Sequence, residues 1–308
     1  MSLISDFSHT SRSSKRKVPT AAGILRARIA EQGLVHVMAA HSPLSAILVE
    51  EAGFDGIWAS GFELSALYGL PDVSLVSMTQ HLDMVRAMAE QSSLPIVADI
   101  DTGFGNAVNV IHAVRQYERA GAAAVVIEDK TFPKVTSLAP EGRQELVRIE
   151  EFVGKIRAAI ASRRNPDFLV IARTEALIAG SGEPEALMRA AAYEEAGADM
   201  ILIHSKQDTP DEVESFLNGW SGRAPIVIVP TTYPQMNEQR IRALSKIGMV
   251  IYGNHAIRAT VTAMKDVFVR VRKDGGIHHV NRDLVSVEEI FRLQRMDRVR
   301  DDEKKFLT

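Results

Sequence analysis

Two carboxylates stand one residue apart where an apolar segment ends. Residues 94–98 are apolar, and they are followed by Asp99, Asp101 and the glycine-rich residues 102–106. Alternate residues of a strand point to the same side, so a strand through Asp101 would aim both carboxylates at one point. Neighbouring carboxylates repel each other unless a cation lies between them, and loop oxygens suit a hard ion such as Mg2+. The simpler alternative is a polar turn that caps a helix starting near Ala107.

Four other apolar segments also end in polar side chains. Their ends read Trp58-Ala59-Ser60-Gly61, Glu128-Asp129-Lys130, Ala172-Arg173 and Ile203-His204. If these segments are parallel strands of one barrel, their carboxyl ends share one face and the polar groups converge there. Asp99, Asp101 and Glu128 would then form an all-oxygen site for Mg2+, with Mn2+ or Co2+ as substitutes. Taken singly, His204 would be read as a core histidine and Glu128 as an ion-pair partner of Lys130.

The same residues predict the kind of substrate. Arg173 is suited to a carboxylate or phosphate group, because guanidinium offers two parallel N–H donors. We therefore expect a small molecule with two anionic groups, chelated by the metal. Mg2+ could polarise a carbonyl of that molecule and stabilise the enolate that forms when a neighbouring bond breaks.

Eight apolar runs that could form strands alternate with longer amphipathic segments. The expected strands are residues 35–40, 56–60, 95–99, 124–128, 168–173, 200–204, 226–230 and 249–253, and the expected helices include 107–120, 147–162, 184–196 and 238–246. Continuous apolar runs are typical of parallel strands covered on both faces. Gly53, Gly121 and Gly197, and more loosely Gly248, stand where a helix would end in the left-handed conformation. The pattern predicts an α/β fold, a (β/α)8 TIM barrel, with an open doubly wound sheet as the main alternative.

The two ends of the chain differ from this pattern. Residues 1–18 are rich in serine and basic residues, and we expect a flexible tail, with an organellar targeting segment as the alternative. Residues 19–308 are expected to form a single barrel domain. Within it, residues 254–273 and 286–300 read as helices beyond the eight that a barrel needs. We expect residues 254–308 to serve oligomer packing.

Composition excludes several classes of protein. The 36 basic and 39 acidic residues give a net charge of -3, so nothing attracts the chain as a whole to nucleic acid or to an anionic membrane. No apolar run approaches the length of a membrane span. The chain has no cysteine, which excludes disulfides and thiol nucleophiles and fits a cytoplasmic protein. We therefore expect no nucleic-acid or membrane partner.

The segment 130–138, continuing through Gly142 and Arg143, is the longest polar insertion between an expected strand and its helix. It follows Glu128 directly and carries Lys134, Thr136 and Ser137. An ordinary surface loop is the plain alternative. We favour a lid that excludes water and completes the site when it closes.

From about residue 20 onward the sequence resembles the phosphoenolpyruvate mutase/isocitrate lyase superfamily. The resemblance rests on Trp58-Ala59-Ser60-Gly61, Asp72, Asp99-Ile100-Asp101-Thr102-Gly103-Phe104-Gly105-Asn106, Glu128-Asp129-Lys130, Arg173 and His204. It implies the metal and enolate chemistry described above. It also implies a homotetramer, a dimer of helix-swapped dimers in which C-terminal helices are exchanged between barrels.

The loop indicates a branch of this superfamily. The lyases carry a lid cysteine as proton donor, and this chain has none. Residues 128–138 are instead similar to the phosphonopyruvate branch, in which a mutase has asparagine where this chain has Thr136. The resemblance thus implies cleavage of the C–P bond of 3-phosphonopyruvate by water. The alternatives are an isomerase that interconverts phosphonopyruvate and phosphoenolpyruvate, an oxaloacetate decarboxylase or other 2-oxo acid lyase, and a non-catalytic barrel that binds anions.

The resemblance also implies roles for individual residues. Substrate binding is expected of Trp58, Ser60, Gly61, Phe62, Ser137, Arg143 and Arg173. A catalytic role is expected of Asp72, Lys134, Thr136, Arg173 and His204. Thr136, with a contribution from His204, would orient the attacking water. The phosphonyl group would be surrounded by Lys134, Ser137 and Arg143. Asp72 would support the metal waters or the lid.

Overall fold

A computed structural model describes residues 19–139 and 144–307. The predicted N-terminal tail, residues 1–18, and the predicted site residue Arg143 lie outside the described residues.

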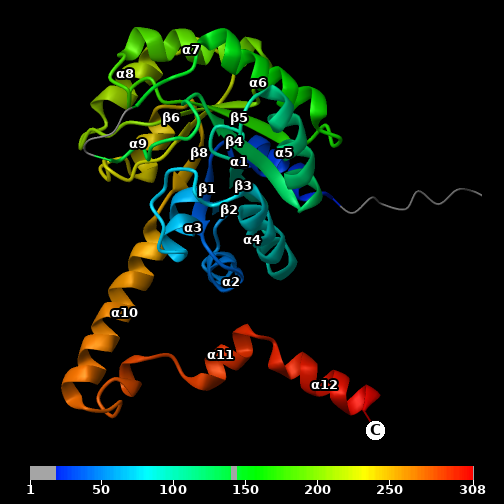
Figure 1. The fold of residues 1–308 in the computed structure, drawn as a ribbon, viewed down its shortest axis with the longest axis vertical. Coiled ribbons are helices and arrows are strands. Elements are labelled where there is room, and N and C mark those ends of the chain that lie inside the picture. The colour runs from blue at the N-terminus through cyan, green and yellow to red at the C-terminus, as the bar shows by residue number, and fades with distance from the viewer. Residues whose placement is uncertain (1–18, 140–143, 308) are drawn as a thin grey trace, which may run out of the picture.

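A closed parallel barrel forms the body of the molecule (Figure 1). In the described residues it has eight strands that pair in sequence order, with β8 closing against β1. The strands are β1 (Val35–Ala40), β2 (Gly56–Ala59), β3 (Ile96–Asp99), β4 (Ala122–Glu128), β5 (Leu169–Thr174), β6 (Met200–Ile203), β7 (Ile226–Ile228) and β8 (Ile247–Tyr252). The predicted (β/α)8 fold is confirmed, and the open-sheet alternative is wrong.

Helices surround the barrel and account for the apolar character of its strands. They are α2 (Pro43–Glu51), α3 (Gly61–Leu67), α4 (Met78–Gln91), α5 (Ala107–Arg119), α6 (Ile149–Ser162), α7 (Glu183–Glu195), α8 (Asp211–Gly219) and α9 (Glu238–Ala243). Every residue of β3, β4 and β5 is buried, because side chains on one face fill the barrel and those on the other meet a helix. The preceding helix α1 (Ala21–Gln32) packs against β4 and β1.

The helix-to-strand turns follow the prediction at three of the four glycines. Gly53, Gly121 and Gly197 have φ values of 81°, 95° and 101°, in the left-handed region. Gly248 does not end a helix and lies inside β8. Helix α9 ends earlier than expected, at Ala243, and Ser245 with φ 55° makes the reversal there.

The C-terminal residues extend away from the barrel (Figure 1). They form α10 (His255–Asp274), a 3-10 turn η1 (Asn281–Asp283), α11 (Val287–Leu293) and α12 (Met296–Phe306). The single helix predicted over 286–300 is wrong, because Arg295 takes a left-handed backbone with φ 58° and divides it. We call residues 255–307 the C-terminal arm. None of the helices in the described residues is both long and apolar enough to cross a membrane.

Candidate active site

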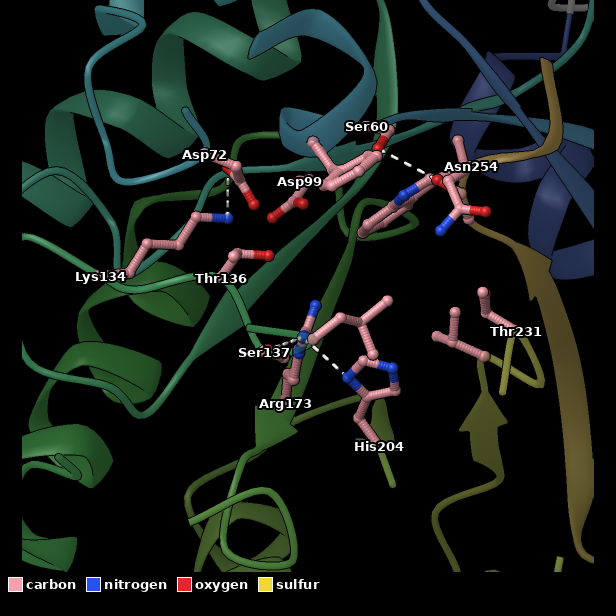
Figure 2. A pocket seen from close by; sticks show the side chains of 15 residues that line it. Ser60, Asp72, Asp99, Lys134, Thr136, Ser137, Arg173, His204, Thr231 and Asn254 are labelled. Carbon is pink, nitrogen blue, oxygen red and sulfur yellow. Dashed lines mark hydrogen bonds and ion pairs between the residues drawn. The ribbon is translucent and has the colours of Figure 1, made fainter. Parts of the chain in front are cut away.

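The polar residues at the strand ends gather around one cavity at the carboxyl-terminal face of the barrel (Figure 2). The cavity is lined by Trp58, Ser60, Phe62, Asp72, Asp99, Lys134, Thr136, Ser137, Leu138, Arg173, His204, Val229, Thr231, Gly253 and Asn254. The structure therefore brings together most of the side chains that the sequence singled out. Ten of the lining residues are labelled in Figure 2, which shows that they come from different strand ends and loops and face a common space.

Asp99 and Asp101 converge, but not by the route that strand alternation predicts. Strand β3 ends at Asp99, and Asp101 has a left-handed backbone with φ 50°. The Asp101 N–H donates to Asp99 Oδ1 at 3.2 Å, and its carbonyl accepts from Glu128 N at 2.9 Å. The turn that reverses the chain thus replaces the expected continuation of the strand. Period-two reasoning fails here because the residues beyond Asp99 are no longer extended.

Gly61 marks the point at which these two carboxylates meet. A Cβ atom added there would lie 3.3 Å from Asp99 Oδ2 and 3.2 Å from Asp101 Oδ1. A side chain at this position would therefore fill the space between the two oxygens. Gly61 also begins helix α3, whose N-cap Ser60 accepts a hydrogen bond from Glu63 N at 3.2 Å and donates to Gly253 O at 3.2 Å.

Lys134 places its ammonium group among the carboxylates. Its Nζ atom lies 2.7 Å from Asp101 Oδ1 and 3.2 Å from Asp72 Oδ1, and the second pair is drawn in Figure 2. Burial alone would lower the pKa of Lys134, but Asp101 and Asp72 raise it well above its usual value. The side chain therefore stays protonated and supplies a fixed positive charge at the edge of the cavity.

Glu128 carries the least satisfied carboxylate of the site. It is only 1 % exposed, and neither of its side-chain oxygens has a hydrogen-bond partner in the described part of the chain. Arg173 Nε lies 3.3 Å from Glu128 Oε2, an ion pair without hydrogen-bond geometry. Burial raises the pKa of Glu128 to about 7, against the opposing charges of Arg173 and Lys130. A carboxylate that is buried without hydrogen bonds is stabilised in its charged form only by a further positive partner, such as a bound cation.

Of the three predicted metal ligands, Asp99 lines the cavity, whereas Asp101 lines a second pocket that shares Asp99 and Asp72 with it, and Glu128 is buried beside Arg173. The three side chains do not form a closed cluster. In residues 19–139 and 144–307, no three His, Cys, Asp or Glu side chains are arranged as a ready metal-binding group. The residues nevertheless fit Mg2+, because the donors are all oxygens, the Glu128 oxygens are orphaned, and Gly61 leaves room beside Asp99. Mg2+ keeps several waters and needs only one or two direct carboxylates.

Arg173 and His204 form a second, cationic side of the cavity (Figure 2). Arg173 Nη2 lies 3.1 Å from His204 Nδ1 and 2.8 Å from Ser137 Oγ. Guanidinium can only donate, so Nδ1 accepts and the hydrogen of the ring resides on Nε2. Burial lowers the pKa of His204 and keeps the imidazole neutral. Its Nε2 atom, without a partner among the described residues, is therefore a free N–H donor.

The predicted lid segment, residues 130–138, lies over the cavity. At its base Lys130 pairs with Leu146, and Thr131 N donates to Glu145 O at 2.9 Å. Gln144 Nε2 donates to Thr136 O at 3.1 Å. Thr136 itself lines the cavity between Lys134 and Arg173 (Figure 2). Residues 144–146 thus hold this segment in its position over the cavity.

Some residues at the site were not singled out by their type and spacing. Thr231 and Asn254 line the cavity just after β7 and β8, so the strand-end rule applied to all eight strands would have found them. Glu175 is fully buried behind Arg173 and contacts it at 2.5 Å. The only feature of the sequence that points to Glu175 is its position directly after the last residue of β5, two residues beyond Arg173.

A barrel whose strand ends carry carboxylates and an arginine around a cavity, with a polar loop over it, is typical of enzymes that act on small anions. Comparison with known proteins narrows this class. The family model for phosphoenolpyruvate phosphomutase matches residues 25–272. The chain is 61% identical over 283 residues to phosphonopyruvate hydrolase of Variovorax sp. (strain Pal2), covering 92% of this chain and 98% of that protein.

A second relative and a solved structure support the same family. Phosphoenolpyruvate phosphomutase of Tetrahymena pyriformis is 44% identical, over 92% of this chain and 94% of its own. A crystal structure of phosphonopyruvate hydrolase with oxalate and Mg2+ superposes with a TM-score of 0.89 at 58% identity, covering 94% of this chain and all of that one. The chain belongs to the phosphoenolpyruvate phosphomutase family, which confirms the superfamily that the sequence indicated.

Proposed function

We propose that this protein hydrolyses the C–P bond of 3-phosphonopyruvate to give pyruvate and phosphate. The observation that carries the proposal is the threonine at position 136, placed in a cavity that also presents Lys134 and Arg173 to an anion. The 61% identity to phosphonopyruvate hydrolase supports the same reaction. In the reaction, water attacks phosphorus, the C–P electron pair passes into the pyruvate enolate, and a proton then converts the enolate to pyruvate.

Asp99, Asp101 and Glu128 are the residues that would hold Mg2+. The ion, when bound, supplies a positive charge for the oxygen of the enolate that leaves phosphorus. The relative crystallised with oxalate and Mg2+ supports this choice of metal. Asp99 and Asp101 flank the space beside Gly61, and Glu128 offers two carboxylate oxygens without a hydrogen-bond partner among the described residues, so these side chains would supply the oxygen ligands.

The carboxylate end of the substrate would lie against Arg173, Ser60 and Gly61. Trp58 and Phe62 would form the apolar wall beside it, as both line the cavity. The predicted role of Ser137 needs revision. Its hydroxyl donates to Glu175 at 2.5 Å and accepts from Arg173 at 2.8 Å, so it orients Arg173 rather than facing the phosphonyl group.

The phosphonyl group would lie between Lys134 and Thr136. Lys134 neutralises the charge that phosphoryl transfer develops on the oxygens, which is the main task of a protein in such a reaction. Thr136 would hold the attacking water through its hydroxyl. His204 can assist only as a donor through Nε2, because Nδ1 accepts from Arg173. Asp72, paired with Lys134, would fix the position of the ammonium.

Replacing Thr136 with asparagine should lower the rate of phosphate release by about tenfold or more, because the larger amide takes the place of the attacking water. The measurement is phosphorus NMR of phosphonopyruvate with Mg2+ and purified protein. Thr131→Asn, in the same loop but outside the cavity, is the matched control and should keep the rate. If hydrolysis by the Thr136→Asn variant is unchanged, the role given to Thr136 is wrong.

The same spectra test the proposed function against its alternatives. Phosphate and pyruvate in equal amounts are the expected products of the unaltered protein. Phosphoenolpyruvate as the main product would instead identify a mutase. No turnover of phosphonopyruvate, with release of carbon dioxide from oxaloacetate, would identify a decarboxylase. If none of these substrates is turned over with any of the metals, the protein would be a non-catalytic barrel that binds anions.

We also infer that the protein is a homotetramer in which the C-terminal arm packs on a second copy. The arm exposes large apolar side chains in the single chain, including Phe268 at 65% and Val285 at 66%. Its contacts with its own barrel include the ion pair of Arg292 with Glu51 at 2.7 Å. Phe268→Asp should reduce the mass measured by light scattering, whereas a tetramer that persists in this variant would contradict the packing proposed.

A further inference from the structure

Glu175 is a fully buried carboxylate that the proposed reaction does not use. It stands just beyond β5 (Leu169–Thr174) and does not line the cavity. It nevertheless contacts residues from both the barrel and the lid segment. Burial opposes its charge, but Arg173 and Lys130 lower the pKa of Glu175 well below its usual value, so it is a carboxylate at neutral pH.

Each oxygen of Glu175 serves a different part of the site. Oε1 accepts from Arg173 Nε at 2.5 Å. Oε2 accepts from the Ser137 hydroxyl at 2.5 Å and forms an ion pair with Lys130 Nζ at 2.9 Å. The backbone is held too, since Glu175 N donates to Asp129 Oδ1 at 2.8 Å. One rigid carboxylate therefore bridges the guanidinium of the barrel and the hydroxyl of the lid.

Ser137 closes this bridge into a ring. Its hydroxyl oxygen accepts from Arg173 Nη2 at 2.8 Å and from Lys130 Nζ at 2.7 Å. With Nε and Nη2 both occupied by protein groups, Nη1 is the donor nitrogen of Arg173 for which the described residues offer no hydrogen-bond partner. The orientation of that nitrogen thus depends on Glu175 and His204, which contact Arg173 from the barrel, and on Ser137, which contacts it from the lid segment.

We infer that Glu175 is a positioning residue that couples closure of the lid to the orientation of Arg173. When Ser137 docks on Glu175, Arg173 Nη2 gains the Ser137 hydroxyl in addition to His204 Nδ1, and Arg173 presents Nη1 to the anionic substrate. When the lid opens, Arg173 loses the Ser137 contact, and Glu175 keeps its ion pairs with Arg173 Nε and Lys130 and its contact with His204. Substrate capture and lid closure would then favour each other, because both depend on the same ring of hydrogen bonds.

A merely structural role is the competing interpretation. Ion pairs in an interior commonly stabilise a fold without affecting a ligand, and Asp199 offers an example in this chain. Asp199 pairs with Arg26 at 2.6 Å and with Arg163 at 2.9 Å, just before β6 and so at the other end of the barrel. Asp199→Asn is therefore a matched control that removes a twice-paired carboxylate away from the lid.

The experiment compares Glu175→Gln with Asp199→Asn in the full chain. Amide hydrogen exchange over residues 131–139 is measured with and without Mg2+ and oxalate, and kcat and KM are measured with phosphonopyruvate. In Glu175→Gln we expect exchange in this segment to rise about tenfold, because charged hydrogen bonds are lost. We expect kcat/KM to fall about 100-fold, as misplacement of a binding group by about 1 Å does.

Ser137→Ala tests the same link without touching a buried charge. It should raise exchange over 131–139 and weaken oxalate binding, measured by calorimetry, while leaving the melting temperature close to that of the unaltered protein. The proposal is overturned if either variant loses stability like Asp199→Asn but keeps lid exchange and oxalate affinity. The kinetic measurement rests on the proposed function. The exchange and calorimetric measurements do not, so the two failures can be told apart.

Discussion

Asp99→Asn is expected to reduce kcat/KM for phosphonopyruvate by about 10^4-fold, which corresponds to about 5 kcal/mol of transition-state stabilisation. Asp99 is buried at the end of β3, with its Oδ2 atom beside the space that Gly61 leaves open. Asparagine keeps the shape and loses the charge. The loss should therefore fall on the divalent cation, which a neutral amide holds less tightly.

Metal binding itself distinguishes this explanation from damage to the fold. Titration with Mn2+ followed by electron paramagnetic resonance should show weaker binding in Asp99→Asn, with an unchanged melting temperature. Asp83→Asn is the control, because Asp83 is an exposed residue of α4 paired with Arg86 at 2.8 Å. Equal Mn2+ affinity in Asp99→Asn and the unaltered protein would remove Asp99 from the set of ligands.

Lys134→Met is expected to lower kcat/KM by about a thousandfold. Methionine fills a similar space but removes the charge that lies 2.7 Å from Asp101 and faces the proposed phosphonyl position. Charge neutralisation of this kind contributes several kcal/mol to phosphoryl transfer. Steady-state assays of phosphate release would measure the loss, which should appear in kcat more than in KM.

Lys246→Met provides the comparison for Lys134→Met. Lys246 Nζ donates to the carbonyls of Leu217 and Trp220 at 2.7 and 2.5 Å, just before β8 and so away from the cavity. Its replacement should cost stability and leave kcat unchanged. If Lys134→Met kept near-normal kcat, the phosphonyl group would have to bind elsewhere in the cavity.

The barrel could be predicted because its strands are buried on both faces, which leaves apolar runs in the sequence at a regular spacing. The boundary errors have local causes. A left-handed Arg295 divides the last predicted helix, and Ser245 ends the turn that Gly248 was expected to end. Nothing in the type of either residue announces a positive φ, since glycine and asparagine adopt it more readily.

The part of the site that could be predicted from the sequence consists of side chains at the ends of strands. Asp99, Glu128, Arg173 and His204 were found because each one lies within one residue of the end of a strand. The ion pair of Lys134 with Asp101 was not, because it depends on how a long loop folds back over the barrel. Glu175 was missed because burial and bridging contacts have no signature in a sequence.

The separation of Thr136 from the barrel core has an evolutionary consequence. The residue that we assign to the choice of phosphoryl acceptor is on a loop, whereas Asp99 and Glu128, two of the carboxylates that we propose for the metal, end strands of the barrel. A substitution in the loop can redirect the product without unpacking a strand or disturbing a ligand. Catalysts with different outcomes can therefore diverge from one another by few mutations, each of which leaves a foldable protein.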